Sequence, residues 1–156
     1  MPGTVVIGIG NPDRGDDAFG RVVAARLRGR LPAYAVLVEA NGEATALLDG
    51  FAGADLAILI DAAVSVGDPG EVHRFDVSSA PLPVAKYGLS THGFGLAEAV
   101  ELARTLGTLP RRCVVYAVEA SSFEPGAALS PALVPAVDEV ARRVIGEAEQ
   151  WSAADA

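Results

Sequence analysis

Short apolar, β-branched runs that alternate with longer amphipathic stretches constrain the fold of this chain most strongly. The run 4–9 lacks polar alternation, which is typical of a strand buried on both faces. We predict strands at 4–9, 35–38, 56–60, 71–77 and 113–118, and helices at 19–31, 45–51 and 95–106, with a last helix opening at Ser130-Pro131. This alternation predicts an α/β fold, a single-domain three-layer αβα sandwich with a mostly parallel, twisted sheet of about five strands.

The predicted domain spans residues 1–150, and residues 151–156 form a C-terminal tail that we expect to fray from Trp151 onward. Pro135 lies early in the last helix, where we expect it to bend the helix by removing a backbone hydrogen bond. The length of 156 residues suits one domain with a core of its own.

Charge and composition exclude several partners. The formal net charge of −8 repels phosphate backbones, so we expect no nucleic-acid partner. The most apolar stretch, 56–66, is interrupted by Asp61 and is too short for a membrane helix, and no basic segment of a signal peptide precedes the first strand. With a single cysteine, Cys113, the chain forms no internal disulfide, and we expect a cytoplasmic protein without a membrane partner.

Two adjacent carboxylates, Asp16 and Asp17, follow the first predicted strand. Ligands of such sheets bind beyond the carboxyl ends of the strands, which gives this loop weight. The loop fails the dinucleotide fingerprint because Asp13 stands at the third glycine position. One carboxylate could stabilise the N-terminus of the following helix. Capping explains both together less well, because the two adjacent negative charges repel each other.

A third carboxylate and an imidazole occupy comparable loops. Asp61 directly follows the apolar run 56–60, so it either accepts hydrogen bonds from a neighbouring loop or serves as a ligand or acid–base group. His92 precedes a predicted helix, whereas His73 lies within a predicted strand with no carboxylate-bearing loop beside it, so we assign His73 a structural role. Asp17, Asp61 and His92 together form a ligand set with open positions that suits nickel, zinc or manganese.

Other reaction classes lack their motifs. The sequence contains no H-E-x-x-H, C-x-x-C, Walker loop or G-x-S-x-G elbow. Cys113 falls in a predicted buried strand and is expected to act as a small apolar residue.

Several segments, in this order, resemble the endopeptidases that mature the large subunit of [NiFe] hydrogenases. The resemblance covers nearly the whole chain, and the matching segments are Gly8-Ile9-Gly10-Asn11 with Asp16-Asp17 and Gly20, Asp61-Ala62, Pro69-Gly70-Glu71-Val72-His73-Arg74-Phe75, Ser90-Thr91-His92-Gly93 with Gly95-Leu96-Ala97-Glu98-Ala99, and Phe123-Glu124-Pro125-Gly126 with Leu129-Ser130-Pro131. The segment 39–45 departs from the glycine- and threonine-rich loop of many members, which bears on substrate choice.

The resemblance implies an endopeptidase that removes a C-terminal extension from the nickel-loaded large-subunit precursor. It implies that Asp17, Asp61 and His92 are the catalytic residues that bind the nickel, which the precursor brings and for which zinc or another divalent ion could substitute. We add the hypothesis that Asp16 acts as general base. Glu39 and Asn11 are the predicted substrate-binding residues, and we expect a monomer or weak oligomer with no other cofactor.

Two alternatives remain open. A non-hydrolytic nickel chaperone could use the same three ligands. Peptidyl-tRNA hydrolases have a similar start, but they place a histidine soon after it and need a basic face, whereas the first histidine here is His73 and the chain is acidic.

Overall fold

The computed structural model describes residues 3–64, 67–83 and 94–155 of the chain. Its strands are β1 (Thr4–Ile9), β2 (Ala35–Ala40), β3 (Leu56–Val64), β4 (Val72–Asp76) and β5 (Arg112–Ala120). Its α-helices are α1 (Phe19–Leu27), α2 (Ala44–Phe51), α4 (Phe94–Leu106) and α5 (Val134–Asp155), and the 3-10 helices η1 (Gly15–Ala18) and η2 (Pro131–Leu133) precede α1 and α5. None of the helices in these ranges is both long and apolar enough to cross a membrane.

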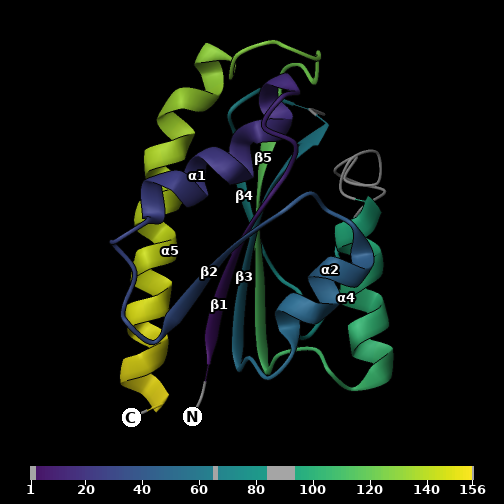
Figure 1. Ribbon diagram of the computed structural model, residues 1–156, viewed down its shortest axis with the longest axis vertical. Helices are drawn as coiled ribbons and strands as arrows, with labels where there is room; N and C mark the ends of the chain where they lie inside the picture. The colour runs from purple at the N-terminus through teal and green to yellow at the C-terminus, as the bar shows by residue number, and fades with distance from the viewer. Residues whose placement is uncertain (1–2, 65–66, 84–93, 156) are drawn as a thin grey trace.

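The five strands form one sheet in the order β2-β1-β3-β5-β4. Every neighbouring pair is parallel except β4 and β5, which are antiparallel. Helices α1 and α5 cover one face of the sheet, and α2 and α4 cover the other (Figure 1). Each pair of helices packs over one of the two apolar clusters of the core. The predicted three-layer α/β sandwich with a mostly parallel sheet is therefore confirmed.

Strand β3 is longer than the sequence predicts. Its register with β5 continues through Asp61 and Ala62 to Val64, so Asp61 lies within the strand rather than just after it. Because successive side chains of a strand alternate between faces, Asp61 points to the same side as Leu59 and Ala63, which belong to the cluster under α2 and α4.

The C-terminal helix differs from prediction at both ends. Pro135 is the second residue of α5, early in the helix as predicted. An N–H at this position has no acceptor within α5, so the lost hydrogen bond that was expected to bend the helix does not arise there. At the other end, α5 continues to Asp155 through the predicted tail. The Trp151 ring packs against the core cluster and lies 5.1 Å from the guanidinium carbon of Arg111, which holds this end of the helix against the start of β5.

Two glycines let α1 cross β1 at close range. A Cβ on Gly20 would lie 2.3 Å from the Ile9 carbonyl oxygen and 2.4 Å from that of Ile60, and a Cβ on Gly8 would lie 2.3 Å from the Gly20 carbonyl oxygen. This approach brings η1, with its two aspartates, to the carboxyl ends of β1 and β3.

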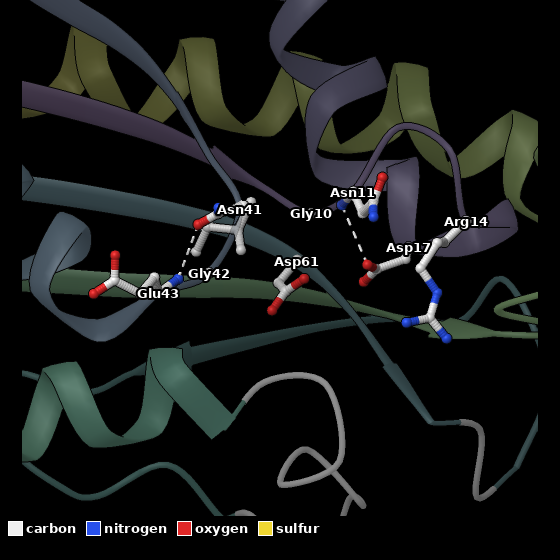
Figure 2. Close-up of a pocket in the computed structure, with 9 residues that line it drawn as sticks. Gly10, Asn11, Arg14, Asp17, Asn41, Gly42, Glu43 and Asp61 are labelled. Carbon is white, nitrogen blue, oxygen red and sulfur yellow. Dashed lines mark hydrogen bonds between the residues drawn. The ribbon is translucent and has the colours of Figure 1, made fainter. Parts of the chain in front are cut away.

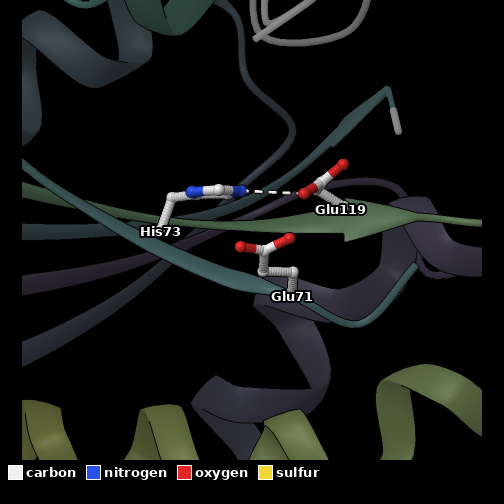
Figure 3. A group of neighbouring side chains, drawn as sticks. All are labelled: Glu71, His73 and Glu119. Atoms are coloured by element: carbon white, nitrogen blue, oxygen red, sulfur yellow. Dashed lines mark hydrogen bonds and ion pairs between the residues drawn. The ribbon is translucent and has the colours of Figure 1, made fainter. Parts of the chain in front are cut away.

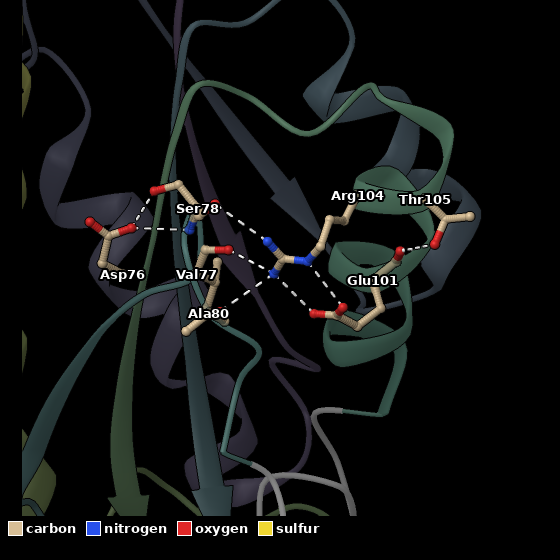
Figure 4. Close-up of polar contacts among 7 residues, drawn as sticks. All are labelled: Asp76, Val77, Ser78, Ala80, Glu101, Arg104 and Thr105. Atoms are coloured by element: carbon tan, nitrogen blue, oxygen red, sulfur yellow. Dashed lines mark hydrogen bonds and ion pairs between the residues drawn. The ribbon is translucent and has the colours of Figure 1, made fainter.

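Arg104 fixes α4 to the segment that follows β4. Its Nη2 donates to the Val77 carbonyl at 2.7 Å, while Nε and Nη2 donate to the Glu101 carboxylate at 3.1 and 3.0 Å (Figure 4). Glu101 and Arg104 lie on the same helix, so the guanidinium is already oriented when it reaches the carbonyl. The contact anchors α4, which begins directly after the segment 84–93.

Candidate active site

A cavity of about 380 Å³ opens at the carboxyl ends of β1, β2 and β3 (Figure 2). Strand β1 lies between β2 and β3, so the order of the strands reverses there, and such points are where α/β sheets bind ligands. The cavity is lined by residues of the first loop, of the segment after β2 and of β3, namely Ile9, Gly10, Asn11, Arg14, Asp17, Asn41, Gly42, Glu43 and Asp61.

Asp61 is a buried carboxylate, and one of its two oxygens has no hydrogen-bond partner among the described residues. The residue is 2% exposed, and its Oδ1 accepts the backbone N–H of Ala62 at 2.8 Å. Its Oδ2 is buried and has no hydrogen-bond partner among the described residues. Burial raises the pKa of Asp61 well above its ordinary value, and the negative charge of Asp17 raises it further.

Asp17 lies in the wall of the same cavity as Asp61 (Figure 2). Its Oδ2 accepts the backbone N–H of Asn11 at 3.2 Å. A Cβ on Gly10 would lie 1.8 Å from the Asp17 carbonyl oxygen, and Gly10 has a φ of 145°, so this turn requires glycine. Two carboxylates that share one cavity repel each other unless a proton or a cation lies between them, so the arrangement favours cation binding.

The third predicted ligand, His92, lies outside the described residues. The structure thus brings together Asp17 and Asp61 of the predicted set, and the position of His92 stays a prediction.

Asp16 is not part of the cavity lining, and it ties η1 to both ends of the loop between β5 and η2. Its carboxylate accepts the backbone N–H groups of Ser121, Ser122 and Ser130 at 2.8, 3.0 and 2.7 Å and the Ser130 hydroxyl at 2.7 Å. Burial alone would raise the pKa of Asp16, but these hydrogen bonds outweigh it and lower the pKa. A carboxylate with four donors and a lowered pKa is a poor proton acceptor, so this environment does not suit the general-base role predicted for Asp16.

The two predicted substrate-binding residues differ in placement. Asn11 lines the cavity, and its side-chain oxygen accepts the backbone N–H of Asp13 at 2.9 Å. Glu39 is not part of the lining and instead pairs with Arg21, at 3.0 Å, and with Arg28. The hydrogen bond from Arg21 is the main reason why the pKa of Glu39 is lowered.

Arg14 and Glu43 line the cavity but were not predicted to do so. Arg14 Nε is buried without a hydrogen-bond partner among the described residues, and Arg14 lines the same cavity as Asp17 (Figure 2). Glu43 belongs to the segment 39–45. The departure of this segment from the family pattern was the sequence feature that could have indicated its place in the cavity lining.

The structural role predicted for His73 rested on the absence of a nearby carboxylate, and that premise is wrong. The His73 Nε2 lies 2.9 Å from Glu119 Oε2, and Glu71 lies close by (Figure 3). The partner was hidden because Glu119 is 46 residues away in the sequence.

The fold and the acidic cavity define a single-domain α/β protein with a cation-binding candidate site at the strand-order reversal. The model of the family described as "Hydrogenase maturation protease" matches residues 22–147, and the chain belongs to this family.

Individual relatives agree with this assignment. The chain is 27% identical to "Hydrogenase 2 maturation protease" of Escherichia coli (strain K12) over 144 residues, which cover 90% of this chain and 87% of that protein. It is 29% identical over 133 residues to "Hydrogenase expression/formation protein HupD" of Thiocapsa roseopersicina, covering 83% of this chain and 60% of that protein. Among solved structures, the hydrogenase maturating endopeptidase HybD from E. coli matches with a TM-score of 0.83 and 26% identity, over 96% of this chain and 93% of that one.

Proposed function

We propose that this protein is an endopeptidase that removes the C-terminal extension of a nickel-loaded [NiFe]-hydrogenase large-subunit precursor. Nickel belongs to the substrate in this proposal, and Asp17, Asp61 and His92 recognise it. The relatives named as hydrogenase maturation proteases support the reaction class, and the cavity supports recognition of a cation.

The buried Oδ2 of Asp61 carries the proposal. A carboxylate oxygen without a partner is costly to bury, and Asp17 in the same cavity increases that cost. A divalent cation would satisfy both groups at once, and carboxylates with one imidazole suit nickel or zinc. The cost is thus tolerated in the free protein and relieved when the metal-bearing substrate arrives.

Each side of the cavity then has a task. Asp17 and Asp61 hold the precursor's nickel on one wall, where the ion can polarise the scissile carbonyl or a bound water. Arg14 lines the same cavity, and its buried Nε–H, which has no partner among the described residues, is suited to donate a hydrogen bond to a carbonyl oxygen of the bound peptide. Asp16 positions the loop that carries Asp17, since it ties η1 to Ser121, Ser122 and Ser130.

Intact-mass spectrometry of a nickel-loaded precursor tests this proposal. With the wild-type protein we expect the precursor mass to fall by the mass of the C-terminal extension. Asp17→Asn and Asp61→Asn should each reduce the cleavage rate by at least about 100-fold, because each removes an anionic ligand of the substrate's metal. Asp49→Asn, an exposed aspartate on α2, serves as the matched control and should cleave at the wild-type rate.

The test also separates hydrolysis from metal delivery. A non-hydrolytic nickel chaperone would bind the precursor and leave its mass unchanged. Full cleavage by both Asp17→Asn and Asp61→Asn would instead show that these carboxylates have a structural role only.

A further inference from the structure

We propose that Glu71, His73 and Glu119 form a second divalent-cation site, separate from the cavity of Asp17 and Asp61. His73 and Glu119 lie on the antiparallel strands β4 and β5 at the edge of the sheet, Glu71 directly precedes β4, and none of the three lines that cavity. This inference does not depend on the proposed peptidase activity, because it rests on the geometry of these three side chains alone.

The donor atoms already converge. One ligand atom from each of the three residues lies within 4.8 Å of the other two (Figure 3). His73 Nε2 and Glu119 Oε2 are 2.9 Å apart. With bonds of about 2.1 Å, neighbouring ligands are about 3.0 Å apart in an octahedral site and about 3.4 Å apart in a tetrahedral one. This hydrogen-bonded pair therefore needs only a small adjustment to hold one ion between its two atoms. Only the Glu71 carboxylate has to move closer.

The strand pairing holds these ligands in place. Val72 pairs with Val118 and His73 with Ala117, so Glu71 lies opposite Glu119. The Glu119 N–H donates to the Glu71 carbonyl at 2.9 Å, and the Gly70 N–H donates to the Glu119 carbonyl at 2.7 Å. Like charges directly opposite each other on paired strands are destabilising. A cation between the two carboxylates would reverse the sign of that interaction.

The cluster is exposed to solvent on the side of Glu71. Glu119 is 3% exposed, whereas Glu71 is exposed, and its carboxylate has no hydrogen-bond partner among the described residues. The Gly67 N–H donates to Glu119 Oε1 at 2.7 Å, which orients the carboxylate with Oε2 toward His73. A Cβ on Gly67 would lie 3.5 Å from both Glu119 oxygens, so glycine keeps this approach uncrowded.

The site lies on the same face of the sheet as Asp61. Asp61 pairs with Ala117, and Ala117 pairs with His73, so the three residues form one row across β3, β5 and β4. Two strand spacings correspond to about 10 Å, too far for one ion to bind both sets of ligands. One imidazole and two carboxylates suit zinc, nickel or manganese.

Imidazole NMR with Zn²⁺ as the probe tests this inference, because the chain has only two histidines. In the His92→Ala variant, His73 is the sole imidazole and reports on the proposed site alone. We expect stepwise addition of Zn²⁺ to shift the ring ¹⁵N resonances of His73 to those of a metal-bound imidazole, saturating at one ion per chain. Ring resonances that do not respond to Zn²⁺ would overturn the proposal.

Variants in the same background assign the ligands. Glu71→Gln and Glu119→Gln should each weaken Zn²⁺ binding at His73 by at least about tenfold, whereas Glu149→Gln, an exposed control on α5, should leave it unchanged. Glu71 is exposed, so Glu71→Gln remains informative even where loss of the buried Glu119 carboxylate disturbs folding. An unaltered affinity in Glu71→Gln, or loss of the His73 response in Asp61→Asn, would refute a separate three-ligand site. Neither result would affect the cleavage test.

Discussion

Two buried aspartates near the same loop have opposite environments. Among the described residues, Asp16 accepts four hydrogen bonds and has a lowered pKa, whereas Asp61 accepts one, from its own strand, and has a raised pKa. The same type of side chain therefore has a different role at each position. Asp16 stabilises the folded loop, and Asp61 keeps an oxygen available for a ligand, at a cost to stability.

Asp16→Asn should destabilise the protein by about 3 kcal/mol, because the amide places an N–H₂ group where four donors need an acceptor. For a domain of this size the melting temperature should fall by about 6–12 °C, which thermal denaturation followed by circular dichroism measures. Asp13→Asn in the same loop is the matched control, since Asp13 is exposed, and it should melt with the wild type. Equal melting of the two variants would contradict the stabilising role of Asp16.

Arg14→Gln should weaken precursor processing without changing stability. The proposed function gives Arg14 a substrate carbonyl to bind, and its buried Nε has no other partner among the described residues. We expect KM for the nickel-loaded precursor to rise by about tenfold, since a charge-assisted hydrogen bond contributes about 1.5–3 kcal/mol. Quantified cleavage against precursor concentration measures it, with an unchanged melting temperature as the control. A lowered melting temperature with an unchanged KM would assign Arg14 to folding.

At the scale of elements, the crossing of β1 and α1 positions the site. Gly20 has backbone oxygens of Ile9 and Ile60 within 2.4 Å of its absent Cβ. Gly20→Ala should therefore push α1 from the sheet and lower the melting temperature by more than about 5 °C, together with the rate of precursor cleavage. Gly146→Ala is a matched helical control, because a Cβ there meets nothing within 4 Å, and it should stabilise α5 by about 0.5–1 kcal/mol. If Gly20→Ala melted at the same temperature as Gly146→Ala, the close crossing of α1 and β1 would not contribute to the stability of the fold.

Local sequence patterns were sufficient to predict most helices and strands. They failed where contacts between distant parts of the chain determine where an element ends. The apolar run 4–9 matches β1 in full. The run 56–60 stops at Asp61 because a charged residue normally ends a buried strand, but pairing with β5 carries β3 on to Val64. The predicted tail after Gln150 is helical because Trp151 packs against the core cluster. This packing is a long-range contact, so the local sequence pattern does not predict it.

At the scale of the whole molecule, the same distinction explains what could be predicted of the sites. Parallel strands bring their carboxyl ends to one edge, so Asp17 and Asp61 could be expected to share a cavity before any coordinates were known. The cluster of Glu71, His73 and Glu119 depends on the antiparallel register of β4 with β5, and no rule of connectivity supplies that register. Alternation within the strand predicted at 71–77 was the available signal, because it places Glu71 and His73 on one face.

Carboxylates whose pKa values are shifted by the fold set how the stability of the whole molecule depends on pH. Asp16, Asp76 and Glu147 have lowered pKa values, so the stability that they contribute is complete above their unfolded values of 3.8 and 4.5 and is lost as the pH falls below them. Asp61 has a raised pKa, so the folded protein retains a proton that the unfolded chain releases, and stability falls as the pH rises above about 4 toward the folded pKa.

The melting temperature of the wild-type protein should therefore be highest near about pH 5 and decline toward neutral pH. Asp61→Asn removes this buried titrating group, so between about pH 5 and 8 its melting temperature should decline less than that of the wild type. Melting curves across this range measure both effects, with the exposed Asp49→Asn variant expected to keep the wild-type decline. A wild-type curve already flat in that range would mean that Asp61 ionises at its ordinary pKa, and the cavity would then lack the cost that a bound cation is proposed to relieve.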